Sequence, residues 1–79
     1  MTEQEIFVKL NGIFRNIFDD KRITVTRETT ARDIGDWDSM EHINLISAVE
    51  REFRMRFKMK EVSSMKNVGE MADIIRERV

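Results

Sequence analysis

The sequence predicts an all-α bundle of four helices, in which the third helix is short and a long loop joins the first two. Apolar residues recur at spacings of three and four, and three cap patterns mark helix starts. Proline is absent and glycine occurs only three times, so helices are rarely interrupted. With 79 residues, 41% of them hydrophobic, we expect one domain over residues 1–79.

The first helix is predicted over residues 3–18. Thr2 and Glu5 form a capping-box pattern at its start. Its apolar face consists of Ile6, Phe7, Leu10, Ile13, Phe14, Ile17 and Phe18. The helix should end near Asp19 and Asp20.

Residues 19–38 form a long connection, and connections of this length in small domains are often functional. Ile23 and Val25 alternate with threonines, which is a weak and short strand-like signal. Gly35 allows a turn before residues 36–38. We expect the apolar residues of the segment to hold it onto the helices, with Trp37 in a packing role rather than as a partner anchor.

Three further elements complete the bundle. A second helix is predicted over residues 39–54, behind an Asp38–Glu41 cap pattern, and a short turn of helix over 60–64. A third cap pattern, Asn67 with Glu70, starts the last helix. The expected apolar faces are Met40, Ile43, Ile46, Val49 and Phe53, with Leu45 and Ala48 beside them, and then Val68, Met71, Ala72, Ile75 and Val79.

Composition excludes several classes of function. The chain has no cysteine and one histidine, so we expect no metal site and no catalytic residues, and hence not an enzyme. A net charge of −1 favours neither nucleic acid nor membrane binding. The N-terminus lacks the basic-then-apolar order of a secretion signal, and no apolar run is long enough to span a bilayer. We expect a cytoplasmic monomer.

Ser39 is the candidate functional residue. If Asp38 caps the second helix, Ser39 occupies the first helical position, near unpaired backbone N–H groups. This end of a helix carries partial positive charge and favours a phosphate group. Position alone leaves two interpretations open, a modified serine and an ordinary capping serine.

The segment Asp38-Ser39-Met40 resembles the Asp-Ser-Leu signature of acyl carrier proteins, with Met in place of Leu. The likeness continues through nearly the whole chain, in helix order, loop length and the segment from Met65 to Ile75. Residues of the second helix that resemble the family are Ile43, Leu45, Ile46, Ala48, Val49, Glu50, Glu52 and Phe53. The tripeptide is a weak signal alone and a strong one at this place in the pattern.

The resemblance implies that Ser39 carries 4'-phosphopantetheine, taken from coenzyme A by a phosphopantetheinyl transferase that needs magnesium. Acyl or aminoacyl groups would ride on the thiol of this arm as thioesters, loaded and used by ligases, synthases or acyltransferases. Asp38 would contact the transferase through a basic residue and Met40 by burial in an apolar pocket. Glu41 and Glu50 are further candidates for partner recognition.

Charge is unevenly distributed. Residues 28–41 hold five acidic residues against Arg32, a balance of −4, and residues 51–60 hold five basic residues against Glu52, a balance of +4. The acidic segment fits attraction to basic partner enzymes. The basic segment departs from the family, as does Asn44, and this favours a specialised lipid, polyketide or nonribosomal-peptide-like pathway over housekeeping fatty acid biosynthesis. We expect the basic segment to be a solvated face.

Alternative interpretations remain. The chain would instead be a non-covalent helical interaction module if Ser39 were dispensable. A nucleic-acid binder is disfavoured because no aromatic residues interleave with exposed basic ones apart from Phe57. His42 is expected to be a solvated helix residue rather than a catalytic base. The six methionines suit either a static core or one that repacks around an acyl chain.

Overall fold

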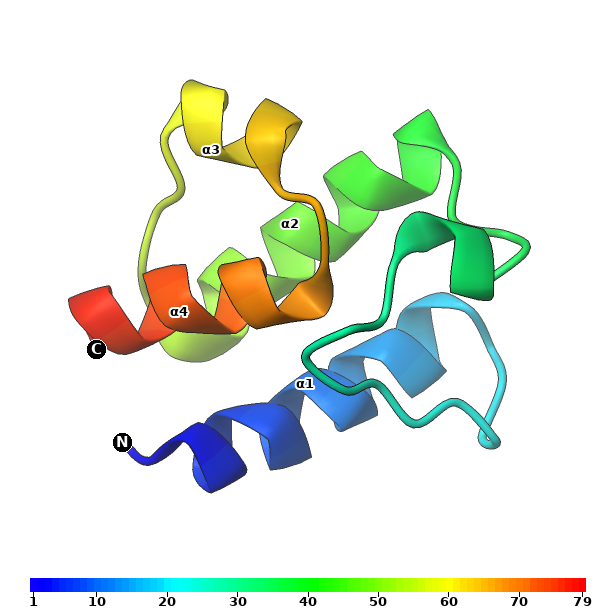
Figure 1. The fold of residues 1–79 in the computed structure, drawn as a ribbon, viewed down its shortest axis with the longest axis horizontal. Coiled ribbons are helices and arrows are strands. Elements are labelled where there is room, and N and C mark those ends of the chain that lie inside the picture. Colours follow the sequence, from blue (N-terminus) through cyan, green and yellow to red (C-terminus); the bar gives the residue numbers. More distant parts are fainter.

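A computed structural model describes all residues, 1–79, and confirms the all-α fold. Four α-helices follow one another without any strand (Figure 1), and a short 3-10 turn, Ala31–Asp33, interrupts the long connection. The helices are α1 (Glu3–Ile17), α2 (Ser39–Phe53), α3 (Met59–Ser64) and α4 (Val68–Arg78). None of them combines the length and apolar character needed to cross a lipid bilayer.

The helix starts lie where the cap patterns predict them. Thr2 accepts the backbone N–H of Glu5 at 3.2 Å, and the Glu5 carboxylate accepts the N–H of Thr2 at 2.7 Å. Asn67 accepts the N–H of Glu70 at 2.9 Å in the same way. These bonds satisfy N–H groups that have no partner within the helix, which fixes each start locally.

The core lies between the three long helices, where α1 packs against both α2 and α4. The fully buried side chains are Ile6, Leu10, Phe14, Leu45, Val49, Val68, Met71 and Ile75. Val79, assigned to the apolar face of the last helix, is 43% exposed beyond the end of α4. Two residues assigned to the apolar face of the second helix are also exposed, Met40 by 75% and Ile43 by 59%. The first turns of α2 extend past the core, so helical periodicity alone misplaces them.

The long connection contains no strand, so the strand-like signal at Ile23 and Val25 is wrong. The backbone groups of this segment bond to side chains of α1 rather than to another strand. Asn11 accepts the N–H of Val25 at 2.7 Å, and Arg15 donates to the carbonyl of Ile23 at 2.6 Å. Val25 is buried and Ile23 packs against the core, so the segment is held down as expected.

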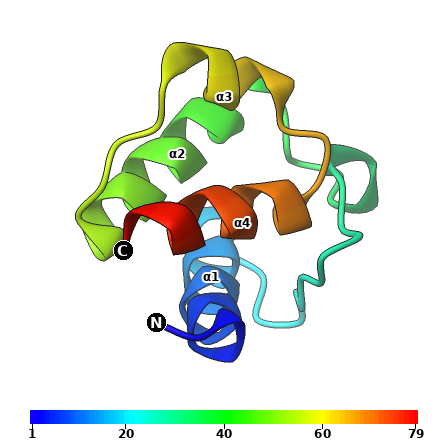
Figure 2. The same cartoon turned by 60° about the vertical axis from the view of Figure 1, so that its left-hand side comes forward.

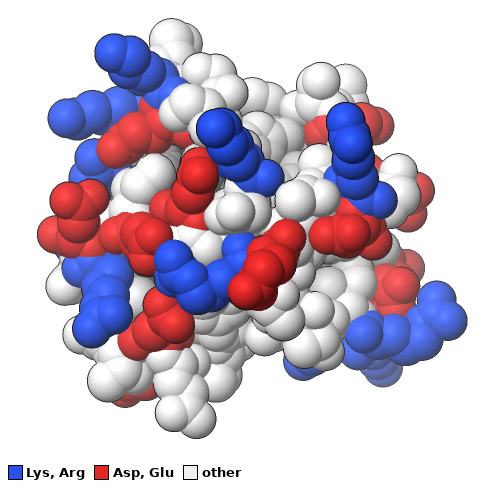
Figure 3. Space-filling model, viewed as in Figure 1, with Lys and Arg blue, Asp and Glu red and all other residues white.

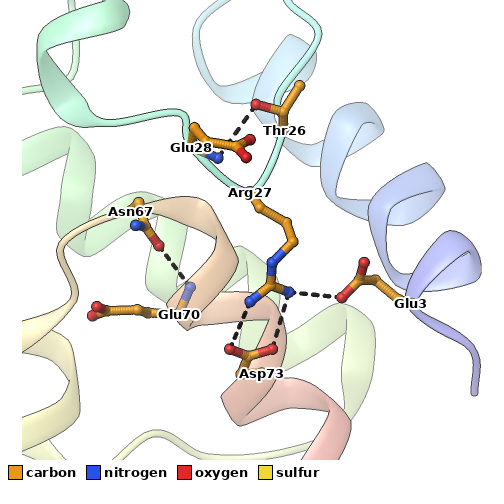
Figure 4. A network of polar contacts seen from close by, with 7 residues as sticks. All are labelled: Glu3, Thr26, Arg27, Glu28, Asn67, Glu70 and Asp73. Atoms are coloured by element: carbon orange, nitrogen blue, oxygen red, sulfur yellow. Dashed lines mark hydrogen bonds and ion pairs between the residues drawn. The ribbon is translucent and has the colours of Figure 1, made fainter.

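The connection also makes backbone contact with the start of α4. The N–H of Val68 donates to the carbonyl of Thr29, and that of Gly69 to the carbonyl of Arg27, both at 2.9 Å. The Arg27 guanidinium binds Asp73 of α4 at 2.9 Å and Glu3 of α1 at 2.7 Å (Figure 4). One residue of the connection therefore links two helices that are far apart in the sequence.

The short helix α3 lies on the side of the molecule away from α1 (Figures 1 and 2). It contributes no fully buried residue. Arg78 near the end of α4 donates to the Glu61 carboxylate at 2.6 Å, and Val62 packs against the edge of the core. Polar contacts therefore carry much of the attachment of α3.

Candidate functional site

Ser39 is exposed at the first position of α2, as the sequence predicts. The residue that caps this helix is Asp38, whose carboxylate accepts the N–H of Glu41 at 2.9 Å. Capping therefore does not require the Ser39 hydroxyl, and the capping-serine interpretation loses its basis. The free hydroxyl stands at the positive end of a helix of 15 residues, where a phosphate group is favoured.

A cleft of about 590 Å³ opens directly beside Ser39. It lies between the end of the long connection, the first turns of α2 and the segment from Val62 to Asn67. Half of its 12 lining residues are hydrophobic, among them Trp37, Ile43, Val62 and Met65. A flexible group attached to Ser39 would therefore have room to lie along a partly apolar wall.

Trp37 forms one wall of this cleft and ties it to the core. Its ring packs edge-on against Phe14, with ring centroids 5.3 Å apart, and also contacts Phe18. Its indole N–H donates to Nδ1 of His42 at 3.0 Å. The expected packing role of Trp37, with a polar neighbour for the indole, is confirmed.

His42 bridges three segments, so the prediction of a solvated residue is wrong. The ring is half-buried and stacks on Trp37, with Nε2 lying 3.0 Å from the carbonyl oxygen of Val62. An indole N–H can only donate, so Nδ1 of His42 accepts and Nε2 donates to Val62. No local pattern in the sequence indicates this bridge, because Val62 lies 20 residues away on the far side of the cleft.

The other predicted recognition residues divide into two groups. Asp38 and Met40 adjoin Ser39 and are exposed, and Glu41 follows with its carboxylate accepting the side-chain amide of Asn44 at 2.8 Å. Glu50 lies about three helical turns further along α2. Its carboxylate accepts the backbone N–H of Phe57 at 2.8 Å, which holds the segment after α2 in place.

Acidic side chains surround the exposed Met40. A hollow of about 530 Å³ beside it is lined by Asp19, Asp36, Asp38 and Glu41. The start of α2 thus presents an apolar side chain and a free hydroxyl within a negatively charged rim. A basic partner with an apolar pocket is the complement of such a surface.

A scan against protein-family models finds no match. Among solved structures, the chain is similar to holo acyl carrier protein from Geobacter metallireducens, determined in solution by NMR. The two share 43% sequence identity over 91% of this chain and 83% of that protein, with a TM-score of 0.86. Likeness in sequence and fold at this level, across most of both chains, shows that this chain belongs to the acyl carrier protein family.

Proposed function

We propose that Ser39 bears a 4'-phosphopantetheine arm, and that residues 1–79 act as one carrier domain that presents acyl or aminoacyl groups to partner enzymes as thioesters. The observation that carries the proposal is the free, exposed Ser39 hydroxyl at the start of α2, next to a partly apolar cleft. The similar Geobacter protein is in the holo form, which supports the same attachment here.

The residues around Ser39 fit such an arm. The positive end of α2 favours the negative charge of a phosphodiester on the Ser39 oxygen. When attached, the arm supplies the thiol that a chain without cysteine lacks. Trp37, Val62 and Met65 offer apolar surface along the cleft.

Asp38, Met40 and Glu41 are the proposed contacts of the phosphopantetheinyl transferase and of the enzymes that load or use the arm. The exposed Met40 side chain is positioned to enter an apolar pocket, and the carboxylates around it attract basic surfaces. Glu50 is proposed as a further contact of these partners, with one of its carboxylate oxygens accepting the backbone N–H of Phe57.

The pathway we propose is a specialised one in the cytoplasm, of the lipid, polyketide or nonribosomal-peptide-like kind. The support is that the second helix and the segment after it depart from the acidic pattern of the family. The departures are Asn44, Arg51 and the basic residues up to Lys60. Partners evolved for a uniformly acidic helix meet like charge there, which costs affinity.

Intact-mass measurement tests the attachment. The purified protein is incubated with coenzyme A, magnesium and a broad-specificity phosphopantetheinyl transferase, and should gain the mass of one phosphopantetheinyl group. Ser39→Ala should gain none, whereas Ser47→Ala, an exposed serine of the same helix, should gain it fully. No gain by the wild type, or a gain that survives in Ser39→Ala, contradicts the proposal. The mass of protein purified from its own cells identifies the cargo.

A further inference from the structure

Five cations without ion-pair partners lie between the end of α2 and the start of α3. They are Arg51, Arg54, Arg56, Lys58 and Lys60, and all five are exposed. The single carboxylate in their sequence segment, that of Glu52, pairs with Lys9 of α1 at 3.0 Å. Figure 3 shows basic side chains gathered on the side of the molecule where α3 begins in Figure 1. Like charges at this density repel one another, so the fold gains nothing from them.

The backbone after α2 places three of these cations on one side. Residues 55–58 are not helical, and burial alternates along them. Met55 and Phe57 are buried against the core, so Arg54, Arg56 and Lys58 all face outward. Arg54 and Arg56, together with Arg51, border an open hollow of about 450 Å³, which Ser47 and Glu50 also line.

Arg54 occupies a backbone conformation that favours another residue type. It ends α2 in the left-handed region, with φ 54° and ψ 51°. Glycine is the usual residue at such helix ends, because a side chain is disfavoured there. The chain therefore has an arginine where glycine would suit the fold better, which points to a use for the charge.

We propose that the basic surface formed by Arg51, Arg54 and Arg56 docks an acidic patch on the enzyme that loads or uses the arm on Ser39. This inference rests on the proposed function. The face of α2 between Met40 and Arg54 is exposed at Ile43, Asn44, Ser47 and Arg51, at spacings of three and four, so one partner can cover it. The 15 residues of α2 span about 22 Å. A protein interface of standard size covers about 800 Å² per partner, which is wide enough to reach both ends.

The charge distribution along α2 favours a protein as the partner over a membrane or a nucleic acid. Asp36, Asp38 and Glu41 lie around Met40, at the other end of α2. A uniformly anionic surface would attract one end of α2 and repel the other. A partner enzyme matches both ends if it has basic residues around its active-site entrance and acidic residues about 20 Å away. Such a pattern also sets the orientation in which the carrier docks.

The experiment begins by trapping the partner through the arm. The transferase loads Ser39 with a pantetheine analogue that ends in a photoreactive group, and irradiation in an extract of the producing cells links the docked enzyme, which is identified and purified. Its association rate and Kd are then measured with the wild type and with Arg51→Glu/Arg54→Glu. Lys21→Glu/Arg76→Glu is the matched control, with the same change in net charge at exposed positions outside α2 and the segment after it.

We expect the Arg51→Glu/Arg54→Glu variant to bind about tenfold more weakly at low salt, with a smaller salt dependence of its Kd, and the control to bind as the wild type does. Arg54→Gly should bind more weakly although it unfolds at higher denaturant concentration. Binding of the Arg51→Glu/Arg54→Glu variant should be restored when acidic residues in the docking patch of the partner are replaced by basic ones.

Several results overturn the inference. The first is an unchanged Kd for the Arg51→Glu/Arg54→Glu variant, and the second is a loss of affinity equal to that of the control. The third is that no protein is trapped although the arm on Ser39 is loaded. Binding of the wild type to phosphatidylglycerol vesicles or duplex DNA, lost in the reversed variant, would assign the surface to those ligands instead. Failure of Ser39 to accept any arm refutes the proposed function itself, and intact mass detects it before the docking step.

Discussion

At the scale of single residues, the neighbouring residues Asp38 and Ser39 have different roles at the start of α2. Asp38 satisfies the helix end, and Ser39 keeps its hydroxyl free. The cap pattern predicted that Asp38 begins the helix, because it involves residues three positions apart, but position alone left open whether Ser39 was itself a capping residue. The sequence was not sufficient for His42, whose partners come from a loop and from the segment around Val62. Contacts across 20 residues have no local signature.

The bridge through His42 predicts a measurable cost on removal. His42→Ala should lower the free energy of unfolding by about 2 kcal/mol, because it removes one acceptor and one donor from half-buried partners. Trp37 is the only tryptophan, so its fluorescence reports the change directly and should shift to longer wavelength as the indole gains water. Urea unfolding followed by this fluorescence measures both effects. Ser47→Ala is the control, and equal midpoints for the two variants would refute the bridge as a stabilising contact.

At the scale of elements, the contact between the long connection and α4 depends on a close backbone approach. A Cβ atom at Gly69 would lie 2.8 Å from the carbonyl oxygen of Arg27, whereas one at Gly12 in α1 would meet nothing within 4 Å. Both glycines lie in helices, where alanine is intrinsically favoured by about 1 kcal/mol. Only the surroundings distinguish the two positions.

Replacing each glycine by alanine should therefore have opposite effects. Gly12→Ala should raise the free energy of unfolding by about 0.5–1 kcal/mol. Gly69→Ala should lower it by about 1–3 kcal/mol, because the connection must move away from α4 and strain its two backbone hydrogen bonds. Denaturant titration of the two variants measures the difference. Stabilisation by both substitutions would show that the connection does not press on α4.

Elements with local signals were predictable and those defined by tertiary partners were not. Cap patterns located the starts of α1, α2 and α4, because the bonds involved lie within one turn. The segment around Val25 carries a strand-like alternation, yet Asn11 and Arg15 take the places of a partner strand. The basic residues after α2 are exposed, as predicted, whereas the burial of the alternating Met55 and Phe57 depends on tertiary partners that the sequence pattern did not indicate.

At the scale of the whole molecule, ion pairs connect the parts that the core does not hold. Arg78 lowers the pKa of the Glu61 carboxyl to about 2, chiefly by its side-chain hydrogen bond, with the backbone N–H of Lys58 adding to the effect. Arg27 lowers the pKa of Asp73 in the same way. Each carboxyl has a lower pKa folded than unfolded, so each favours the folded state above its unfolded pKa. That contribution is lost as the pH falls through the folded pKa.

Acid should therefore lower the free energy of unfolding of the wild type more than that of a variant that lacks the Glu61 carboxylate. Between about pH 5 and pH 2, Glu61→Gln should lose less stability than the wild type, because the amide does not titrate. At about pH 7, Glu61→Gln should be the less stable of the two, since it lacks the charged partner of Arg78. Urea midpoints at several pH values test both statements. Glu77→Gln, an exposed neighbour of Arg78, is the control, and parallel pH profiles for Glu61→Gln and the wild type would contradict the prediction.

The two chain ends lie on one side of the molecule, toward the end of α2 that is opposite to Ser39 (Figures 1 and 2). Arg78 donates to the backbone carbonyl of Arg56 at 3.2 Å, so the tail of α4 adjoins the basic surface. A resin or sensor chip coupled through the N-terminus would accordingly immobilise the carrier with its serine directed at the solution. A bulky label behind Val79 would crowd Arg56 and mask the very charges whose docking is to be measured.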